Sequence, residues 1–384
     1  MAQEQVARRT LTEVWANLER AKLSRSDMQP LAQTVFFHSA NNDDLLLLEV
    51  DSHILEEAKK LGVIIRGDLE DELVLCTGSR TYSVREAEIS NSLLVVPNLR
   101  LAAKGQPLTA AMSKAGDGLD TREVLKTFHL YWEPRQIRPS SRKLHSLLTE
   151  SEYRGIELEG DIPQSSLFSL PKLLNHVQAS ESEIKEMLGA LPVAEVDGCV
   201  RLLGFEYHFR VLEFMLTSIE SNSMPLDKID TNVVIEEVSE LEPHEIVKAV
   251  VSWYVKNQVL LKAKVSRTQG EALLRSGESF NLEQFITTWQ QSLPEGLTTD
   301  VAYLYGISYV DEDRQRPIIN YLSTWDLPEV ESARFDTLLR MKTSWRFEEI
   351  EPYICDLSLK NVNSLLLKYA RSFQKNGHIF YSKK

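Results

Sequence analysis

The sequence has few cysteines and no long hydrophobic run. Its three cysteines, Cys76, Cys199 and Cys355, are far apart and form no CxxC pair, which excludes a disulfide framework and a zinc knuckle. No uninterrupted apolar stretch reaches the roughly 18 to 20 residues that cross a bilayer. The first residues also lack the apolar core of a secretion signal. We therefore expect a cytosolic or nuclear protein that makes no membrane contact.

Motifs that bind nucleotides or catalytic metals are missing as well. The sequence contains no GxxxxGK phosphate loop, no GxGxxG fingerprint and no HExxH zinc helix, each of which needs several residue types at fixed spacing. The acidic runs at 68–72 and 311–313 do not continue into the calcium loop of an EF-hand, so we interpret them as solvated turn tips. We expect no catalytic residues, no metal site and no cofactor.

The net charge of −13 argues against a uniformly basic nucleic-acid binder, because attraction to phosphates needs locally concentrated Lys and Arg. One end of the chain departs from this acidic balance. No Asp or Glu follows Asp356, whereas Lys and Arg continue to the last residue. Any DNA contact is therefore expected near the C-terminus.

The composition is otherwise globular, with 43% hydrophobic and 26% charged residues, in a chain too long for a single core. Short apolar runs dominate the first hundred residues, at 45–50, 63–65, 73–76 and 92–97. Several are continuous rather than alternating, which predicts strands covered on both faces, one face by a partner. We predict a strand-rich partner-assembly domain over 1–100, with β-barrel character completed by partner subunits, and a linker over 101–145.

The rest of the chain combines helices with short hairpins. Ser180 and Glu183 have the spacing of a capping box at the start of a helix, and Asp197-Gly198 then marks a tight hairpin. Helices followed by a hairpin are the order of a winged helix. Related orders recur near 241–265, 281–322 and 335–382. We predict an α+β multidomain protein with tandem winged helices at 146–225, 226–327 and 328–384.

The segment NVNSLLLKYARSF (361–373) is predicted to be the recognition helix of the last winged helix. Val362 and Phe373 lie on its apolar stripe, and Lys368, Arg371 and Lys375 line up on another face. The wing that follows offers its own cations to phosphates. The six residues predicted to bind DNA are Lys368, Arg371, Lys375, His378, Lys383 and Lys384. An ordinary solvated helix face is the alternative.

A second basic cluster lies beside Tyr131 and Trp132 in the sequence. Its members are Arg135, Arg138, Arg142 and Lys143. Such a combination fits a nucleic acid or an acidic partner surface. The nearby prolines indicate an extended connector, however, so a solvated linker is the favoured interpretation.

The run GVIIRGDLEDELVLCTGSRTYSVREAEISNSLLVVP (62–97) resembles the signature of the family of Dcc-type sister-chromatid-cohesion subunits, which belong to the alternative, cohesion-type replication factor C clamp loader. Further similar segments are YWE (131–133), ASESEI (179–184), FITTWQQSLPEGL (285–297), PYICDL (352–357) and LLLKYARSFQKNG (365–377). The resemblance covers most of the chain from about residue 45 onward. It leaves out 98–127.

The resemblance implies a non-catalytic nuclear subunit that acts in PCNA loading during DNA replication and in sister chromatid cohesion. Its strands would share a β-barrel with a small companion subunit and the C-terminal tail of the large cohesion-type clamp-loader subunit. Its winged helices would bind single- or double-stranded DNA, with low sequence specificity, and the catalytic subunit of DNA polymerase epsilon. Other subunits would hydrolyse ATP. The residues assigned to partner assembly are Val63, Ile65, Leu73, Leu75, Leu94 and Val96, and we expect some of them in the chain's own core.

Three other interpretations stay open from the residues alone. A stand-alone winged-helix transcription or chromatin factor predicts a more basic recognition unit and sequence-specific base contacts. A cullin-like scaffold that docks only proteins predicts no salt-dependent DNA affinity. An enzyme predicts a pocket in which titratable groups converge.

Overall fold

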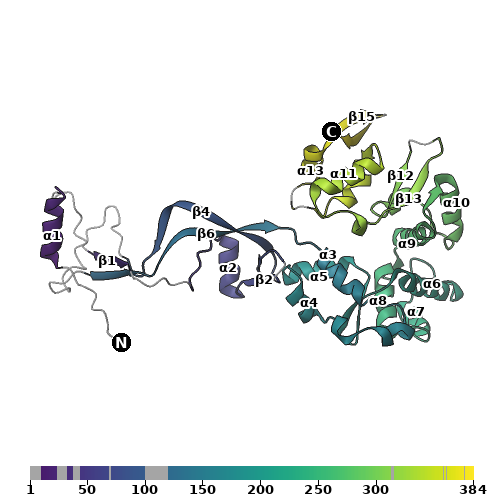
Figure 1. Ribbon diagram of the computed structural model, residues 1–384. Helices are drawn as coiled ribbons and strands as arrows, with labels where there is room; N and C mark the ends of the chain where they lie inside the picture. The colour runs from purple at the N-terminus through teal and green to yellow at the C-terminus, as the bar shows by residue number, and fades with distance from the viewer. Residues whose placement is uncertain are drawn as a thin grey trace. The chain divides into compact units, whose positions relative to one another are not determined.

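The computed structural model describes residues 10–23, 33–37, 44–68, 71–99, 120–312, 315–357, 359, 361–375 and 377–384. The chain divides into two compact units (Figure 1). The first consists of Met1–Leu55 and Val84–Arg135, and the second of Glu56–Ser83 and Gln136–Lys384. The fold is mixed α and β, and the described strands form open sheets.

The first unit is built on a long strand ribbon. Strand β4 (Thr81–Val95) pairs with β6 (Lys126–Ile137), and β1 (Gln33–Phe37) pairs in parallel with β5 (Asp120–Val124). Helix α1 (Leu11–Arg20) begins at a Thr10–Glu13 capping box. Of the run at 45–50, only Leu48 makes a strand bridge, to Trp132. The strand expected over 45–50 is therefore wrong in the described structure.

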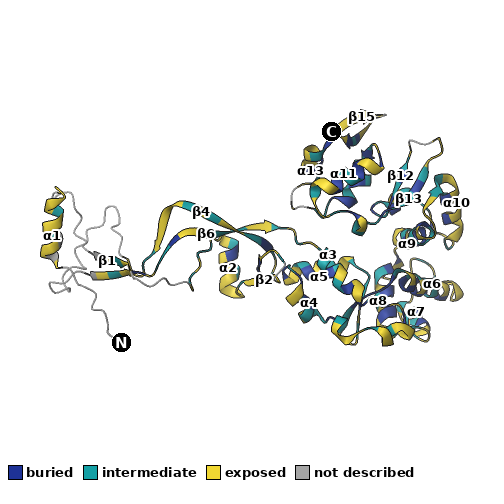
Figure 2. Ribbon diagram, viewed as in Figure 1, coloured by how far each residue is buried: buried dark blue, intermediate teal, exposed yellow. Residues whose placement is uncertain are grey.

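Few hydrophobic side chains are buried in this first unit. Among its described residues they are Ile54, Val124 and Phe128. Most of β4 beyond Val84 is exposed or half-buried (Figure 2). A two-stranded ribbon is at best marginally stable by itself in water, so this unit is short of core.

The strands β2 (Ile64–Arg66) and β3 (Val74–Cys76) belong to the second unit, as do the first residues of β4. They continue the sheet in the order β2-β3-β4-β6. Helix α2 (Ser52–Lys60) precedes them. The hydroxyl of Thr81 ties this part to the helices: it donates to Glu183 Oε2 at 2.6 Å and accepts from the Ser180 N–H at 2.9 Å.

Three helices followed by a hairpin is the order that repeats through the rest of the second unit. The first set is α3 (Arg142–Glu150), α4 (Leu170–His176), α5 (Glu181–Ala190), β7 (Val193–Val196) and β8 (Cys199–Leu202). The Ser180–Glu183 capping box predicted from the sequence is confirmed at the start of α5. The hairpin turn is also confirmed, because Asp197 and Gly198 both have positive φ, as a tight I′-like turn requires.

The second set follows directly. It consists of α6 (Phe205–Ser221), α7 (Thr231–Val238), α8 (His244–Tyr254), β9 (Val255–Lys256) and β10 (Val259–Leu260). The third set has a 3₁₀ helix at Val301–Leu304 in the place of its third α-helix. Its other elements are α9 (Lys262–Arg275), β11 (Ser279–Asn281), α10 (Leu282–Ser292), β12 (Ser308–Asp311) and β13 (Ile318–Tyr321).

The last set closes the chain with a three-stranded sheet in the order β14-β16-β15. Its elements are α11 (Glu331–Met341), β14 (Trp345–Arg346), α12 (Phe347–Ile350), α13 (Val362–Tyr369), β15 (Ala370–Lys375) and β16 (His378–Lys383). The described part of the second unit thus contains four such sets, where the sequence predicts three.

Four hydrophobic clusters accompany these four sets. They are centred on Leu144, Val250, Trp289 and Phe335, each of which is buried. The range 226–327, predicted as one winged helix, contains parts of two clusters. The range 101–145, predicted as a linker, contains β5, β6 and the start of α3 from residue 120 onward. Residues 101–119 lie outside the described residues.

Candidate functional site

The predicted recognition helix changes to a strand halfway along. Helix α13 ends at Tyr369, and Ala370–Lys375 forms β15, which pairs along its whole length with β16. Arg371 and Lys375 are therefore strand residues, and the single helix expected over 361–373 is wrong. Pairing with a second strand outweighs the helical spacing of the sequence, because each β15 residue gains a partner across the hairpin.

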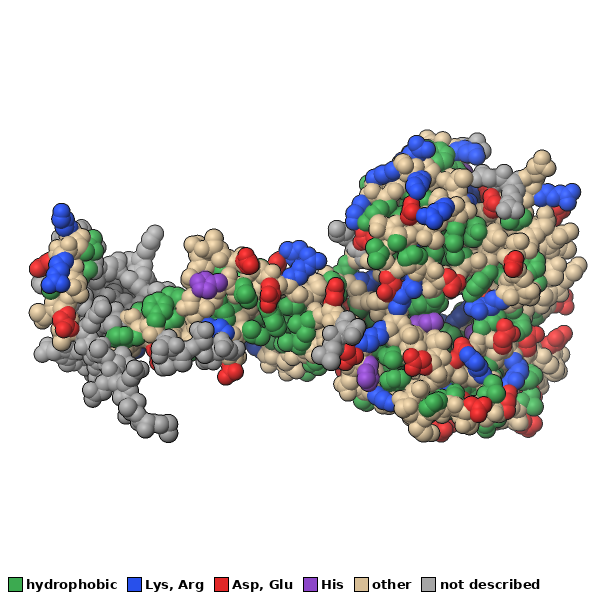
Figure 3. Space-filling model, viewed as in Figure 1, with side chains coloured by type: hydrophobic (Ala, Val, Ile, Leu, Met, Phe, Trp, Pro, Cys, Tyr) green, Lys and Arg blue, Asp and Glu red, His purple; other side chains and the backbone are tan. Residues whose placement is uncertain are grey.

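The β15–β16 pairing places the basic residues in a defined pattern. Arg371 lies opposite Ser382, Phe373 opposite Phe380, and Lys375 opposite His378. Successive side chains of a strand point to opposite faces, so the three β15 residues share one face. Figure 3 shows Lys and Arg side chains gathered over the C-terminal helix and hairpin, at the top of the view.

The other predicted DNA contacts have internal partners. Lys368 Nζ lies 2.8 Å from Glu331 Oε2, and the hydrogen bond to this carboxylate raises the pKa of Lys368 to about 12. Lys383 Nζ lies 2.7 Å from Asp336 Oδ1. Lys384 Nζ donates to the backbone carbonyls of residues 367 and 368. Carboxylates of the same chain thus partly neutralise Lys368 and Lys383, and backbone carbonyls hold the ammonium group of Lys384.

Three of the predicted DNA-binding residues, two cations and one histidine, remain available to a ligand. Arg371 Nε donates to Ser382 Oγ at 3.1 Å. Within the described part of the chain, no carboxylate forms an ion pair with Arg371, Lys375 or His378. The most available part of the predicted site is therefore the hairpin face rather than the helix.

The second basic cluster performs a structural role. Arg138 Nη1 donates to the carbonyl of Cys355 at 2.8 Å. Arg142 donates to the carbonyls of Thr324, Trp325 and Leu327. Lys143 pairs with Asp68 and Asp71. These side chains join distant segments of the second unit, so the solvated connector expected here is wrong.

Arg135 is the last residue of the first unit. Its guanidinium pairs with Glu133 at 3.1 Å, and this partner raises the pKa of Arg135. Each of the four predicted cations therefore has a partner within the chain.

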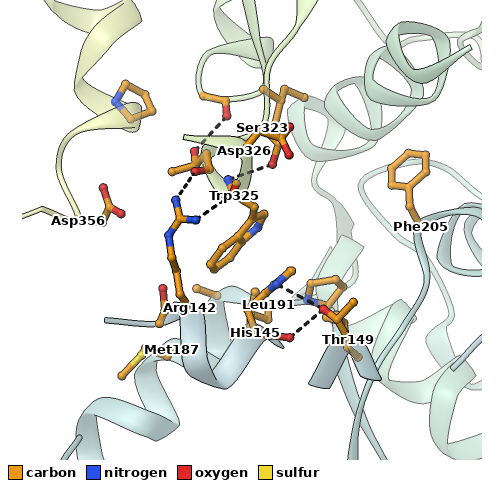
Figure 4. A pocket seen from close by; sticks show the side chains of 18 of the residues that line it. Arg142, His145, Thr149, Met187, Leu191, Phe205, Ser323, Trp325, Asp326 and Asp356 are labelled. Atoms are coloured by element: carbon orange, nitrogen blue, oxygen red, sulfur yellow. Dashed lines mark hydrogen bonds between the residues drawn. The ribbon is translucent and has the colours of Figure 1, made fainter. Parts of the chain in front are cut away.

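A cavity of about 1120 Å³ is lined by residues of all four helical sets of the second unit. Figure 4 shows Arg142 reaching toward the loop that carries Ser323, Trp325 and Asp326. The ring of His145 stacks on Trp325 with 3.9 Å between ring centroids, and burial lowers the pKa of this histidine. Arg275 pairs with Glu271 at 2.8 Å.

The chemistry of this cavity is that of a packing interface. Its arginines bind backbone carbonyls or carboxylates of the same chain, as Arg267 does with the carbonyls of Tyr303 and Tyr305. Arg334 likewise binds Asp356. Across the described parts of the chain, no three His, Cys, Asp or Glu side chains are grouped so that they would hold a metal ion. No described helix is long and apolar enough to cross a membrane.

The residues predicted for partner assembly divide between core and surface. Leu75 is buried in β3, whereas Ile65, Leu73 and Leu94 are exposed. Val63 and Val96 are half-buried and lie just outside the strands. Leu75 is therefore a core residue of the chain itself, in line with the expectation that some of the six are.

Sequence reasoning missed two kinds of residue. Leu93 is as exposed as its predicted neighbour Leu94. Arg346 of β14 lies opposite Phe380 and over its ring. The alternation of 370–375 and 378–383 around Asn376-Gly377 is the hairpin signal that identifies this sheet.

The comparisons with known proteins agree with one another. The family model described as "Sister chromatid cohesion protein Dcc1" matches residues 45–354. A sister chromatid cohesion protein DCC1 of Mus musculus is 33% identical over 100% of this chain and 98% of its own length. Its counterpart in Xenopus tropicalis is 34% identical over 97% and 98%, and that of Saccharomyces cerevisiae 22% identical over 79% and 85%.

The matching family and these relatives are named for sister chromatid cohesion and not for an enzymatic reaction. The chain belongs to the Dcc1 family of sister chromatid cohesion proteins.

Proposed function

We propose that this chain is a non-catalytic subunit of the alternative, cohesion-type replication factor C complex. In this role it acts in the nucleus, supports PCNA loading during DNA replication, and contributes to sister chromatid cohesion. The first unit assembles with the large clamp-loader subunit and its small companion. The second unit uses its helix-and-hairpin sets as winged helices that bind DNA and the catalytic subunit of DNA polymerase epsilon. ATP hydrolysis belongs to other subunits, which fits the lack of a phosphate loop in this sequence.

The observation that carries the assembly role is the exposed strand surface of the first unit. Leu93 and Leu94 are 44% and 45% exposed near the end of β4, and Leu130 of β6 is exposed as well. Figure 3 has hydrophobic side chains on the surface over these strands. Leu93 and Leu94 are successive strand residues, so they expose apolar side chains on both faces of the ribbon. Exposed apolar surface marks interaction sites, and a ribbon with so little core gains stability when partner strands cover it.

Replacement of Leu93 and Leu94 by Asp tests this role in the full-length chain. The expected result is loss of co-purification with the large clamp-loader subunit and its companion, because two carboxylates would have to be buried at the interface. The matched control is Leu241→Asp, an exposed leucine of the second unit. Equal co-purification of both variants would contradict the assignment.

The cations of the C-terminal hairpin support the DNA-binding role. Arg371, Lys375 and His378 have no carboxylate partner in the described structure, and no acid follows Asp356 in the sequence. A local positive surface is sufficient for salt-sensitive binding to phosphates on a protein of negative net charge.

Charge reversal tests the DNA-binding role. In the full-length chain, Arg371→Glu with Lys375→Glu should weaken DNA binding at least about tenfold, and should reduce the slope of log affinity against log salt by about 2. A control with the same change in charge is Lys60→Glu with Lys185→Glu, which are exposed lysines elsewhere. Similar losses in the two double variants would refute a localised site. Undiminished binding by the hairpin variant would favour a scaffold that docks only proteins.

A further inference from the structure

The C-terminal sheet carries a row of side chains across its three strands. Arg346 of β14 lies opposite Phe380 of β16, which lies opposite Phe373 of β15. Their neighbours Trp345 and Tyr381 point to the other face, where both join the hydrophobic cluster of this unit. The row from Arg346 to Phe373 therefore lies on the face directed away from the core.

Two aromatic rings form the centre of this row. The rings of Phe373 and Phe380 stack with 5.8 Å between centroids and 22° between planes. The Arg346 guanidinium lies 5.7 Å from the Phe380 centroid. Phe380 is only 9% exposed, whereas Phe373 is 40% exposed. Phe380 thus supports Phe373 from one side, and the ring of Phe373 is open to solvent.

Two cations and a histidine lie near this ring. Arg371 and Lys375 flank Phe373 on the same face of β15, and His378 lies opposite Lys375. Arg346 Nε is buried without a hydrogen-bond partner. Arg346 and His378 also line a small cavity of about 340 Å³, to which Asn363 contributes an amide and Glu348 a carboxylate. Over the whole sheet face the three cations Arg346, Arg371 and Lys375 outnumber this single acid.

The neighbouring helix α13 offers no unpaired cation to a duplex. A recognition helix presents polar or basic side chains to base edges and phosphates in the major groove. Here α13 exposes Asn363, Ser364 and Leu367, the last 68% exposed, and its single lysine, Lys368, is paired with Glu331. Base faces are hidden inside a duplex but accessible in a single strand, where they stack on exposed aromatic rings between cations.

We propose that this sheet face binds single-stranded DNA, with a base stacked on Phe373 and the flanking phosphates on Arg346, Arg371 and Lys375. The proposal rests on the proposed DNA-binding function and specifies the form of the strand and the residue that contacts the base. Phe373 contributes through its ring, so its effect differs from that of the cations, which act on phosphates in either form of DNA.

The test compares full-length wild-type protein with Phe373→Ala in binding to a labelled oligothymidylate and to a duplex of equal length. Phe373→Ala should weaken single-strand binding about 5- to 140-fold, the range of one lost base stack, and leave duplex binding unchanged. Phe373→Tyr, which retains a ring, should bind as the wild type does. Leu367→Ala is the control for loss of an exposed apolar side chain.

A second arm needs no variant. The wild-type protein should bind an oligonucleotide of the same length with abasic sugars more weakly than oligothymidylate, because the stacking partner is gone. Equal binding of the two oligonucleotides, or no effect of Phe373→Ala, would overturn the stacking proposal while leaving a phosphate-binding hairpin intact. Absence of DNA binding by the wild type would overturn both this proposal and the DNA-binding part of the proposed function.

Discussion

Arg334 is the side chain whose removal should most clearly destabilise the C-terminal part of the chain. It is 1% exposed. Its Nη1 donates to Asp356 Oδ1 at 2.6 Å, to Asp356 Oδ2 at 2.9 Å and to the Tyr353 carbonyl at 3.0 Å, and its Nε donates to the Pro328 carbonyl at 2.6 Å. One guanidinium thus satisfies a carboxylate and two carbonyls.

Arg334→Met keeps an unbranched side chain but leaves these acceptors without their donor. Asp356 is 40% exposed and stays hydrated without the arginine, but the Tyr353 carbonyl is left buried without its donor, which costs about 1 to 3 kcal/mol. Amides whose exchange requires opening of this region should therefore exchange roughly 5- to 140-fold faster, since each 1.4 kcal/mol is a factor of ten. Hydrogen exchange of α11 peptides, followed by mass spectrometry, measures this directly.

The matched control is Arg340→Met on the same helix, where the arginine is exposed and pairs with Asp336 one turn away. Exposed pairs of this kind contribute little, so α11 should exchange almost as in the wild type. If Arg334→Met and Arg340→Met changed exchange equally, the argument from burial would be refuted.

Two further predictions concern buried polar groups of the second unit. Thr81→Val removes the hydroxyl that bonds to Glu183 and Ser180, and should cost about 1 to 3 kcal/mol in urea unfolding, whereas Thr81→Ser should retain most of the stability. Burial lowers the pKa of His208 to about 4, below its ordinary value of 6.5. Between these two pH values the histidine is protonated in the unfolded chain but neutral in the folded chain. The folded state should therefore lose up to about 3 kcal/mol as pH falls from about 6.5 to about 4. Urea unfolding across this pH range should show the loss in the wild type and a smaller one in His208→Gln; an identical slope in both proteins would contradict the assignment.

Local features of the fold were predictable because they depend on neighbouring residues. The Ser180–Glu183 capping box and the Asp197-Gly198 turn are recognisable from spacing and residue type, and both are present. The helix proposed over 361–373 failed for the opposite reason. Its apolar spacing fits a helix, but from residue 370 the chain pairs with 378–383, and such pairing overrides local periodicity.

The sequence predicts which basic residues the candidate site contains, but it does not predict how they are arranged or which of them are paired. The absence of acids after Asp356 pointed to a basic C-terminus. Which cations are available depends on distant carboxylates, however: Glu331 holds Lys368 and Asp336 holds Lys383. Arg142 looked like part of a basic linker because the carbonyls it binds lie some 180 residues further along the chain.

The central claim is that the exposed strands of the first unit are a surface for clamp-loader partners. Hydrogen exchange of the full-length chain, alone and mixed with the large subunit's C-terminal tail and the small companion, tests it most directly. The account predicts a stable three-component complex in which exchange slows over 84–95 and 126–135. A chain that remained alone, with unchanged exchange in both segments, would contradict it.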